Sequence, residues 1–147
     1  MQRTLVLCKP DAVQRGLVGR IIARFEDKGL KIAGLKMIRV DDALAAKHYA
    51  EHVEKSFYPE LRGFVTSSPV VAMAVEGKNA VEVVRALMGV TNPQIAAPGT
   101  IRGDFGLNLT KNLVHGSDSL ASAEREVALF FSEDELHDYD LTIGVWQ

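Results

Sequence analysis

Residues 4–40 read TLVLCKPDAVQRGLVGRIIARFEDKGLKIAGLKMIRV and predict a strand, a helix and a second strand in succession. Residues 4–8 form a continuous apolar run with β-branched members, which is typical of a strand buried on both faces. Apolar residues then recur at helical spacing on one face, at Val18, Ile21, Ile22 and Phe25. Gly29 is placed to end that helix, and residues 31–40 have the composition of a second strand with imperfect alternation.

The chain then continues with helices and two further strands. Asp41 or Asp42 could cap a helix that runs to His48, and a shorter helical stretch follows at 57–61. The remaining elements are a strand at 69–75, a helix from Asn79 with the stripe Val83, Val84, Leu87 and Met88, a short strand at 113–115, and a last helix capped by Ser122 with Ala123, Val127 and Phe130 facing inward. This order predicts an α+β fold with a ferredoxin-like βαββαβ core, in which a four-stranded antiparallel sheet carries its helices on one face and extra helices are added.

Residues 89–111 interrupt this pattern, since no helical or strand period crosses them. The segment is rich in turn-forming residues, namely Gly89, Pro93, Pro98, Gly99, Gly103 and Gly106. A connection this long in a compact domain is usually functional or disordered. Four apolar residues give it something to pack with, namely Ile95, Ile101, Phe105 and Leu107, and so we expect a long ordered loop.

Bulk properties narrow the class of protein. The chain has 147 residues, 47% of them hydrophobic and 24% charged, which is typical of one globular domain. With 17 basic and 19 acidic side chains, its net charge of −2 provides no bulk attraction for nucleic acid. Cys8 is the single cysteine, which fits a reducing compartment. The apolar run that follows the first residues is too short for a signal peptide or a membrane span. We therefore expect a cytoplasmic protein.

Familiar short motifs for nucleotides, metals and nucleophilic serine are absent from the sequence: it has no GxxxxGK[ST], no strand-linked GxGxxG, no CxxC, no HExxH and no GxSxG. Groups suited to phosphate nevertheless gather near the predicted loops, namely Lys9, Arg85, Thr91, Arg102, Lys111 and Asn112. Each has an alternative structural interpretation. Lys9 could be a solvated head at a strand end, Arg85 could lie on the wet face of its helix, and Thr91 could belong to an ordinary turn.

The four histidines are open to similar alternatives. His48 and His52 lie four residues apart on a predicted helix and superficially resemble a metal-binding pair, but no third ligand lies at a suggestive spacing. His137 stands among acidic residues and is expected at the surface. His115, in NLVHGSDS at 112–119, is either a nucleophile or the point where a strand ends in a turn.

The combination of motifs is more informative than any one of them. LCKPDA, PGTIRGDF and NLVHGSDS together resemble the nucleoside diphosphate kinase family, and HYAEH, TNP and SAEREV extend the match in the same order. The resemblance covers essentially the whole chain, so it implies a single domain of this family over residues 1–147. It also implies transfer of the terminal phosphate of a nucleoside triphosphate, mainly ATP, to a nucleoside diphosphate, with broad base and sugar specificity.

The resemblance assigns roles to the catalytic residues. His115 corresponds to the family's nucleophile, which forms a phosphohistidine in a ping-pong mechanism, and a neutral imidazole is competent for that attack. Glu126 corresponds to the carboxylate that holds the other ring nitrogen, with Ser117 in support, so Nδ1 would take the phosphate. Lys9, Tyr49 and Asn112 would surround the transferring phosphate and the sugar hydroxyls. Gly116 would leave room for the phosphate to approach.

Nucleotide binding is assigned in the same way. Arg85, Thr91 and Arg102 would grip the remaining phosphates, while His52 and Lys55 occupy variable positions on the phosphate side. The base would stack on Phe57, with Leu109 opposite and Leu61 nearby, although Phe57 could instead be a core aromatic. Mg²⁺ would arrive on the nucleotide without protein ligands. The family resemblance also implies a homohexamer in which residues 89–111 contribute to the contacts.

Two departures from the family pattern bear on affinity. Ala12 stands where glycine is common after KPD, and Lys55-Ser56-Phe57-Tyr58 replaces a form with Arg-Pro before the phenylalanine. Three other functions remain as alternatives: an RNA-binding domain, a small-molecule sensor and an inactive scaffold. The predicted strands at 4–8 and 69–75 lack the aromatic residues of RNA-binding sheets, and a sensor would not become labelled by ATP. The presence of His115, Lys9, Arg102 and Asn112 argues against a scaffold.

Overall fold

The computed structural model describes residues 1–146 of the chain. Its elements follow in the order β1 (Gln2–Cys8), α1 (Pro10–Gln14), α2 (Val18–Asp27), β2 (Lys31–Ile38), α3 (Asp42–His48), η1 (Ala50–His52), α4 (Tyr58–Val65), β3 (Val70–Gly77), α5 (Ala80–Met88), α6 (Ile101–Phe105), β4 (Val114–Gly116), α7 (Leu120–Phe130), η2 (Glu133–Glu135) and η3 (Gly144–Trp146).

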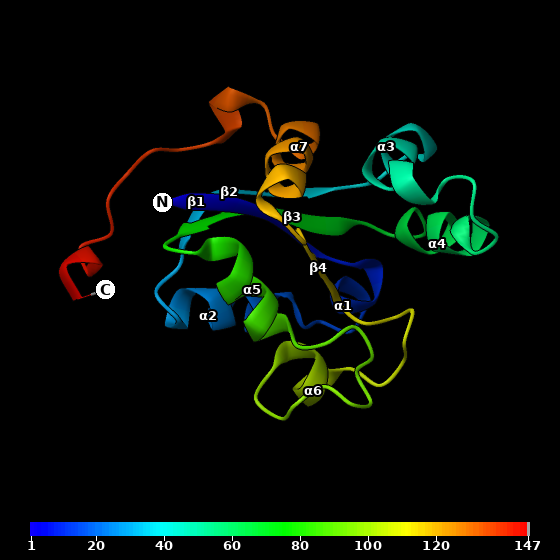
Figure 1. Cartoon of the computed structure of the whole chain (residues 1–147), viewed down its shortest axis with the longest axis horizontal. Helices are drawn as coiled ribbons and strands as arrows, with labels where there is room; N and C mark the ends of the chain where they lie inside the picture. The colour runs from blue at the N-terminus through cyan, green and yellow to red at the C-terminus, as the bar shows by residue number, and fades with distance from the viewer. Residues whose placement is uncertain (147) are drawn as a thin grey trace.

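The four strands form one antiparallel sheet in the order β2-β3-β1-β4, as Figure 1 shows. This confirms the predicted α+β fold with a four-stranded antiparallel sheet. The register places His115 of the short strand β4 directly opposite Leu7 of the central strand β1. Strand β2 is irregular between Ile32 and Gly34, which explains the imperfect alternation of its sequence.

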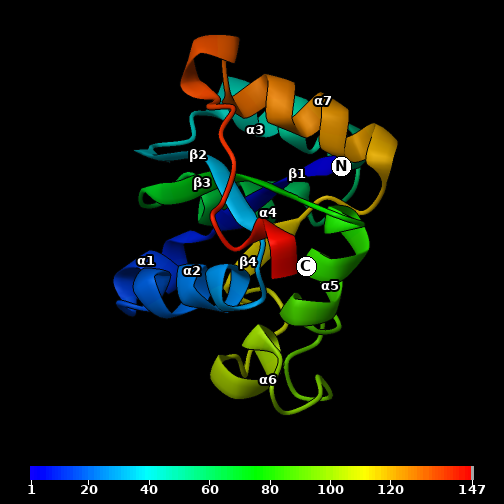
Figure 2. The same ribbon diagram turned by 90° about the vertical axis from the view of Figure 1, so that its left-hand side faces the viewer.

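Helices cover both faces of the sheet, not one face as expected. Figures 1 and 2 show α1, α2 and α5 on one side and α3 and α7 on the other. Alternate residues of β1 therefore enter different cores: Val6 packs with the α2 and α5 cluster, whereas Leu5 and Leu7 pack with the α7 cluster. The extra helices turn the exposed face of a ferredoxin-like sheet into a second core, which accounts for the unbroken apolar run at 4–8.

Helix ends differ from expectation at several points. The unexpected helix α1 begins with Pro10 at its first turn and is only 5 residues long, too short to show a period. Asp41 caps α3 as expected, accepting a hydrogen bond from the Leu44 amide. The prediction that Ser122 caps α7 is wrong, because Ser119 is the N-cap and accepts from the Ser122 amide. Asn79 lies at the N-cap of α5 without making a side-chain bond there.

The segment at 89–111 is held in place by side chains and contains the short helix α6, which its sequence does not predict. Thr100 caps α6 by accepting from the Gly103 amide, and Ile101 is fully buried. Arg24 of α2 donates to the Gly99 carbonyl and to Asp104. These contacts fix the loop against the body of the protein.

None of the helices within residues 1–146 has the length and apolar character needed to cross a bilayer.

Candidate active site

A cleft of about 310 Å³ lies beside β4 and collects most of the predicted site residues. Its lining comprises Lys9, His48, Tyr49, Glu51, His52, Arg85, Met88, Thr91, Arg102, Asn112, Val114, His115, Gly116, Asp118, Ser122, Arg125 and Glu126. A larger hollow of about 730 Å³ lies beside α7 and the start of β1. The carboxylates of Glu124, Glu133 and Asp138 line that hollow and would repel phosphate, so the smaller cleft is the candidate site.

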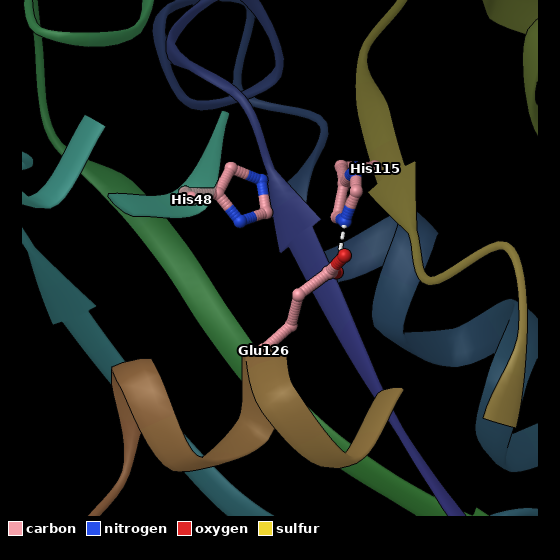
Figure 3. Close-up of side chains that lie close together, drawn as sticks. All are labelled: His48, His115 and Glu126. Carbon is pink, nitrogen blue, oxygen red and sulfur yellow. Dashed lines mark hydrogen bonds and ion pairs between the residues drawn. The ribbon is translucent and has the colours of Figure 1, made fainter. Parts of the chain in front are cut away.

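The side chain of His115 is oriented by the helix that follows it. Because residues of a strand alternate, Val114 and Gly116 face α5 while His115 faces α7. Figure 3 shows His115 Nε2 bonded to Glu126, at 2.6 Å from Oε1. The hydroxyl of Ser117 donates to the same oxygen at 2.9 Å. A carboxylate only accepts, so Nε2 carries the ring proton and Nδ1 keeps its lone pair.

His48, the last residue of α3, lies against the ring of His115. The two imidazoles meet edge to face with centroids 4.6 Å apart, and Phe130 packs on the same ring of His48 at 5.2 Å. Burial lowers the pKa of His48 to about 2, with the nearby His115, Arg125 and Lys9 acting in the same direction. His48 is therefore a neutral neighbour of His115, a position that the sequence does not suggest.

The donor atoms of His48, His115 and Glu126 lie within 4.8 Å of one another, which raises the question of a metal centre (Figure 3). Two nitrogens and one carboxylate oxygen do form catalytic zinc sites. Ligand bonds of about 2.0–2.1 Å, however, separate two tetrahedral ligands by roughly 3.4 Å. Nε2 of His115 and Oε1 of Glu126 are only 2.6 Å apart and share a proton, so an ion would have to break that bond. The geometry favours an oriented histidine over a metal centre.

Lys9 provides a buried cation at the floor of the cleft. Its ammonium donates to Asn112 Oδ1 at 2.7 Å, and the side chain is 9% exposed, which excludes a solvated head. Burial, and secondarily the charge of Arg102, lowers the pKa of Lys9 to about 8, while Asp11 raises it. The amide of Asn112 in turn donates to the Thr91 carbonyl at 3.0 Å. These bonds join the KPD segment to both ends of the 89–111 loop.

Two arginines add to this positive field. The guanidinium of Arg102 donates to the carbonyls of Asn112, Gly89 and Val114, which uses three of its five N–H groups and leaves two for a ligand. Burial, and then the charge of Arg85, lowers the pKa of Arg102 to about 10. Arg85 is an exposed residue of α5 that lines the cleft and donates to the Gly116 carbonyl at 3.1 Å.

Tyr49 completes the inner wall. Its ring contacts that of His48 edge to face, with centroids 4.5 Å apart. Burial, reinforced by the charge of Glu126, raises the pKa of the phenol above its ordinary value. The hydroxyl of Tyr49 therefore keeps its proton and can donate to a ligand.

The predicted base-binding residues lie outside the lining of the cleft. Phe57 is 48% exposed, which excludes a core aromatic, and Leu61 and Leu109 are also absent from the lining. The ring of His52 lies 5.4 Å from that of Phe57, and the ammonium of Lys55 lies 5.8 Å from the Phe57 centroid. His52 thus lies beside the exposed ring of Phe57 and also lines the cleft.

Gly116 and Ala12 have packing roles that the sequence does not suggest. A Cβ atom on Gly116 would lie 2.5 Å from Met88 Sδ and 3.2 Å from Val84 Cγ1, so the glycine allows α5 to approach β4 closely. Access for phosphate is not needed to explain it. Ala12 is buried in the core with α2 and α5 and does not line the cleft.

Two cleft residues receive no role from the sequence, although Asp118 lies in NLVHGSDS and Arg125 in SAEREV. Asp118 follows Ser117, and hydrogen bonding from Ser122 and the charge of Arg85 lower the pKa of its carboxyl. Arg125 lies beside Glu126 in the chain, with its Nη2 3.6 Å from Glu126 Oε2. Both side chains are exposed. Asp118 reaches the cleft because it lies just after β4, whereas Arg125 reaches it from α7.

Comparison with known proteins agrees with this geometry. A sequence model described as nucleoside diphosphate kinase matches residues 2–136. The chain is 61% identical over 146 residues to the nucleoside diphosphate kinase of Pelotomaculum thermopropionicum, covering 99% of this chain and 98% of that protein. It is 58% identical over 146 residues to that of Archaeoglobus fulgidus, covering 99% and 97%.

Solved structures give the same result. The halophilic nucleoside diphosphate kinase of Halobacterium salinarum, in complex with CDP, superimposes with a TM-score of 0.97 at 54% identity, covering 99% of this chain and 97% of that one. The enzyme of Borrelia burgdorferi, a transition-state mimic with bound vanadate and ADP, gives 0.91 at 39% identity, covering 97% and 94%. The chain described here belongs to the nucleoside diphosphate kinase family, whose members are nucleotide-binding phosphotransferases.

Proposed function

We propose that the cleft transfers the terminal phosphate of a nucleoside triphosphate to a nucleoside diphosphate through a phosphohistidine on His115. The observation that carries this is the 2.6 Å bond from His115 Nε2 to Glu126, which leaves Nδ1 as the free nucleophile in a cleft with four cationic side chains, those of Lys9, Arg85, Arg102 and Arg125. The Nδ1 lone pair attacks the terminal phosphorus, the N–P bond forms, and the bond to the bridging oxygen breaks. The diphosphate leaves with that electron pair, and a second diphosphate reverses the step.

The surrounding residues stabilise the charge that moves during transfer. Glu126 accepts a hydrogen bond from Nε2–H throughout and so stabilises the positive charge that develops on the ring. Lys9, Tyr49 and Asn112 contact the transferring phosphate and the sugar hydroxyls in this account. Arg85, Thr91 and Arg102 bind the other phosphates: the paired N–H donors of the two guanidinium groups and the hydroxyl of Thr91 suit phosphate oxygens.

Base binding is proposed at the exposed aromatic near the cleft. A base stacking on Phe57 would be enclosed by Leu61 and Leu109, and stacking tolerates every base. This arrangement supports broad specificity, because it needs no hydrogen bonds to the base edge. His52 and Lys55 would lie on the phosphate side of the same surface.

Mg²⁺ is proposed to accompany the nucleotide. Lys9 and the two arginines suit phosphate and not a cation, whereas Glu51 and Asp118 offer carboxylate oxygens at the cleft that could bind waters of the ion. The ion would supply charge neutralisation on the phosphates. The protein residues would still position the nucleotide and orient His115.

Three further features belong to this proposal. ATP is the main donor, and residues 1–147 form one domain that assembles as a homohexamer with contacts from 89–111. Exposed Ile95 and Leu107 on that loop support a contact surface. A reducing compartment such as the cytoplasm is supported by the free buried thiol of Cys8.

Incubation with ATP labelled in its terminal phosphate tests the proposal directly. We expect an acid-labile, base-stable label on the wild type and on His137→Ala, a matched change at an exposed histidine. We expect none on His115→Ala, and GDP should remove the wild-type label as GTP. Label on His115→Ala would reject the proposed nucleophile, and an unlabelled wild type would support the inactive scaffold.

A further inference from the structure

Asp11, the acidic residue of the KPD segment, has no part in the proposed mechanism and does not line the cleft. It lies in α1, and its Oδ2 accepts a hydrogen bond from the Leu113 amide at 3.0 Å. The other oxygen, Oδ1, is buried without a hydrogen-bond partner among the described residues. The carboxylate therefore makes one specific contact, to a backbone group two residues before His115.

Leu113 has an unusual backbone conformation, and its amide is the group that bonds to Asp11. Its φ is +76°, and among residues 1–146 only Asn79 is another non-glycine residue with positive φ. Asparagine tolerates that region, whereas leucine adopts it only where the surroundings compel it. The carbonyl of Leu113 accepts from the Lys9 amide at 2.8 Å, and its side chain is fully buried. Both polar groups of this residue are thus bonded to the segment 9–11.

The left-handed turn at Leu113 joins two parts of the active site. Asn112, the residue before Leu113, accepts a hydrogen bond from the ammonium of Lys9, and His115 lies two residues after Leu113 in β4. Strand β4 is only 3 residues long, so pairing with β1 alone gives it little to fix its entry. Arg102 holds the carbonyls on either side, those of Asn112 and Val114. What remains to be held is the Leu113 amide, and Asp11 holds it.

We propose that Asp11 is a positioning residue for phosphoryl transfer: by holding the Leu113 amide, it fixes Asn112 and the His115 ring relative to each other. The proposal rests on the proposed function of His115. A displacement of about 1 Å at reacting groups lowers rates by roughly a hundredfold, so a small shift of this turn has a measurable effect.

Asp11 also carries a charge, which must be separated from its hydrogen bond. The charges facing Lys9 are Arg102, which lowers the pKa of the ammonium, and Asp11, which raises it. Asp11→Asn keeps an acceptor oxygen in place and removes the charge. Asp11→Glu keeps the charge and displaces the acceptor by one methylene. Asp41→Glu is a matched control. Asp41 also accepts a hydrogen bond from a backbone N–H, that of Leu44, at a distance of 2.8 Å, and it does not line the cleft.

The test compares the single-turnover rate of phosphorylation by ATP, KM and thermal unfolding for these variants. We expect Asp11→Glu to lower the rate roughly tenfold to a hundredfold with little change in KM. Asp11→Asn should keep a rate near that of the wild type at pH 7. As the pH is raised, its activity should fall at a lower pH than that of the wild type, because removing the charge of Asp11 lowers the pKa of Lys9. Asp41→Glu should keep the wild-type rate.

A wild-type rate for Asp11→Glu, with only its melting temperature lowered, would overturn the proposal in favour of a purely structural aspartate. An Asp11→Asn rate at pH 7 as low as that of Asp11→Glu would overturn it in favour of a charge effect. Failure of the proposed function gives a different result, since label would then persist on His115→Ala or be absent from the wild type.

Discussion

Glu126 Oε1 lies 2.6 Å from His115 Nε2, so a carboxylate from α7 determines which nitrogen of a β4 side chain faces the cleft. We expect Glu126→Gln to lower kcat by about a hundredfold or more while KM changes little. An amide can present its NH₂ group to Nε2 and favour the wrong tautomer, and loss of the charge destabilises the developing cation. Steady-state kinetics with ATP and GDP check this prediction. A variant with a raised KM and unchanged kcat would assign Glu126 to binding.

The buried ammonium of Lys9 predicts a pH dependence. Its pKa of about 8 means that Lys9 is charged below that pH and loses its proton above it. Because phosphate binding needs the charge, kcat/KM should fall as the pH rises through about 8. Bound phosphates raise the pKa of the ammonium, so kcat should persist to higher pH. Parallel pH profiles of kcat/KM and kcat measure both, and a flat kcat/KM from pH 7 to pH 9.5 would contradict this interpretation of Lys9.

Phe57 is half-exposed and available for stacking. Phe57→Ala should weaken nucleotide binding by about 1–3 kcal/mol, similarly for purine and pyrimidine nucleotides, without lowering stability. Equilibrium binding of ADP and CDP measures this, with Met37→Ala as a control at an exposed apolar residue of β2. Equal affinities in the Phe57 variant and the wild type would place the base elsewhere.

Gly116 is explained by the packing of α5 on β4. Gly116→Ala should lower the free energy of unfolding by about 1–3 kcal/mol, because its Cβ would lie 2.5 Å from Met88 Sδ. Met88→Ala removes that sulfur, so the double variant should lose less stability than the two single losses added together. Urea unfolding of the four proteins tests the coupling. Strict additivity would reopen the interpretation of Gly116 as space for phosphate.

The sequence indicates the larger elements because they have a period or a continuous apolar run. The strand at 4–8 and the amphipathic α2 are examples. It does not indicate α1 or α6, each 5 residues long, since neither completes enough turns to show a pattern. It also places the helices on one face of the sheet, because a local pattern cannot say which face an added helix will cover.

The residues of the candidate site also fall into those that the sequence indicates and those that it does not. His115, Lys9 and Arg102 are predicted because family motifs mark them, and the structure brings them to one cleft. The neutral ring of His48 and the left-handed turn of Leu113 leave no trace in the sequence, because burial and a φ angle depend on partners far along the chain. The packing role of Gly116 is not predicted for that reason, since the atom that a Cβ would meet belongs to α5.

The position of the phosphate on the His115 ring tests the central claim most directly. Rapid denaturation in base after reaction with ATP, followed by ¹⁵N–³¹P correlation NMR of the labelled protein, distinguishes the two phosphohistidine isomers. Because Glu126 holds Nε2, we predict phosphate on Nδ1 of His115. Phosphate on Nε2, or on another histidine, would contradict the account.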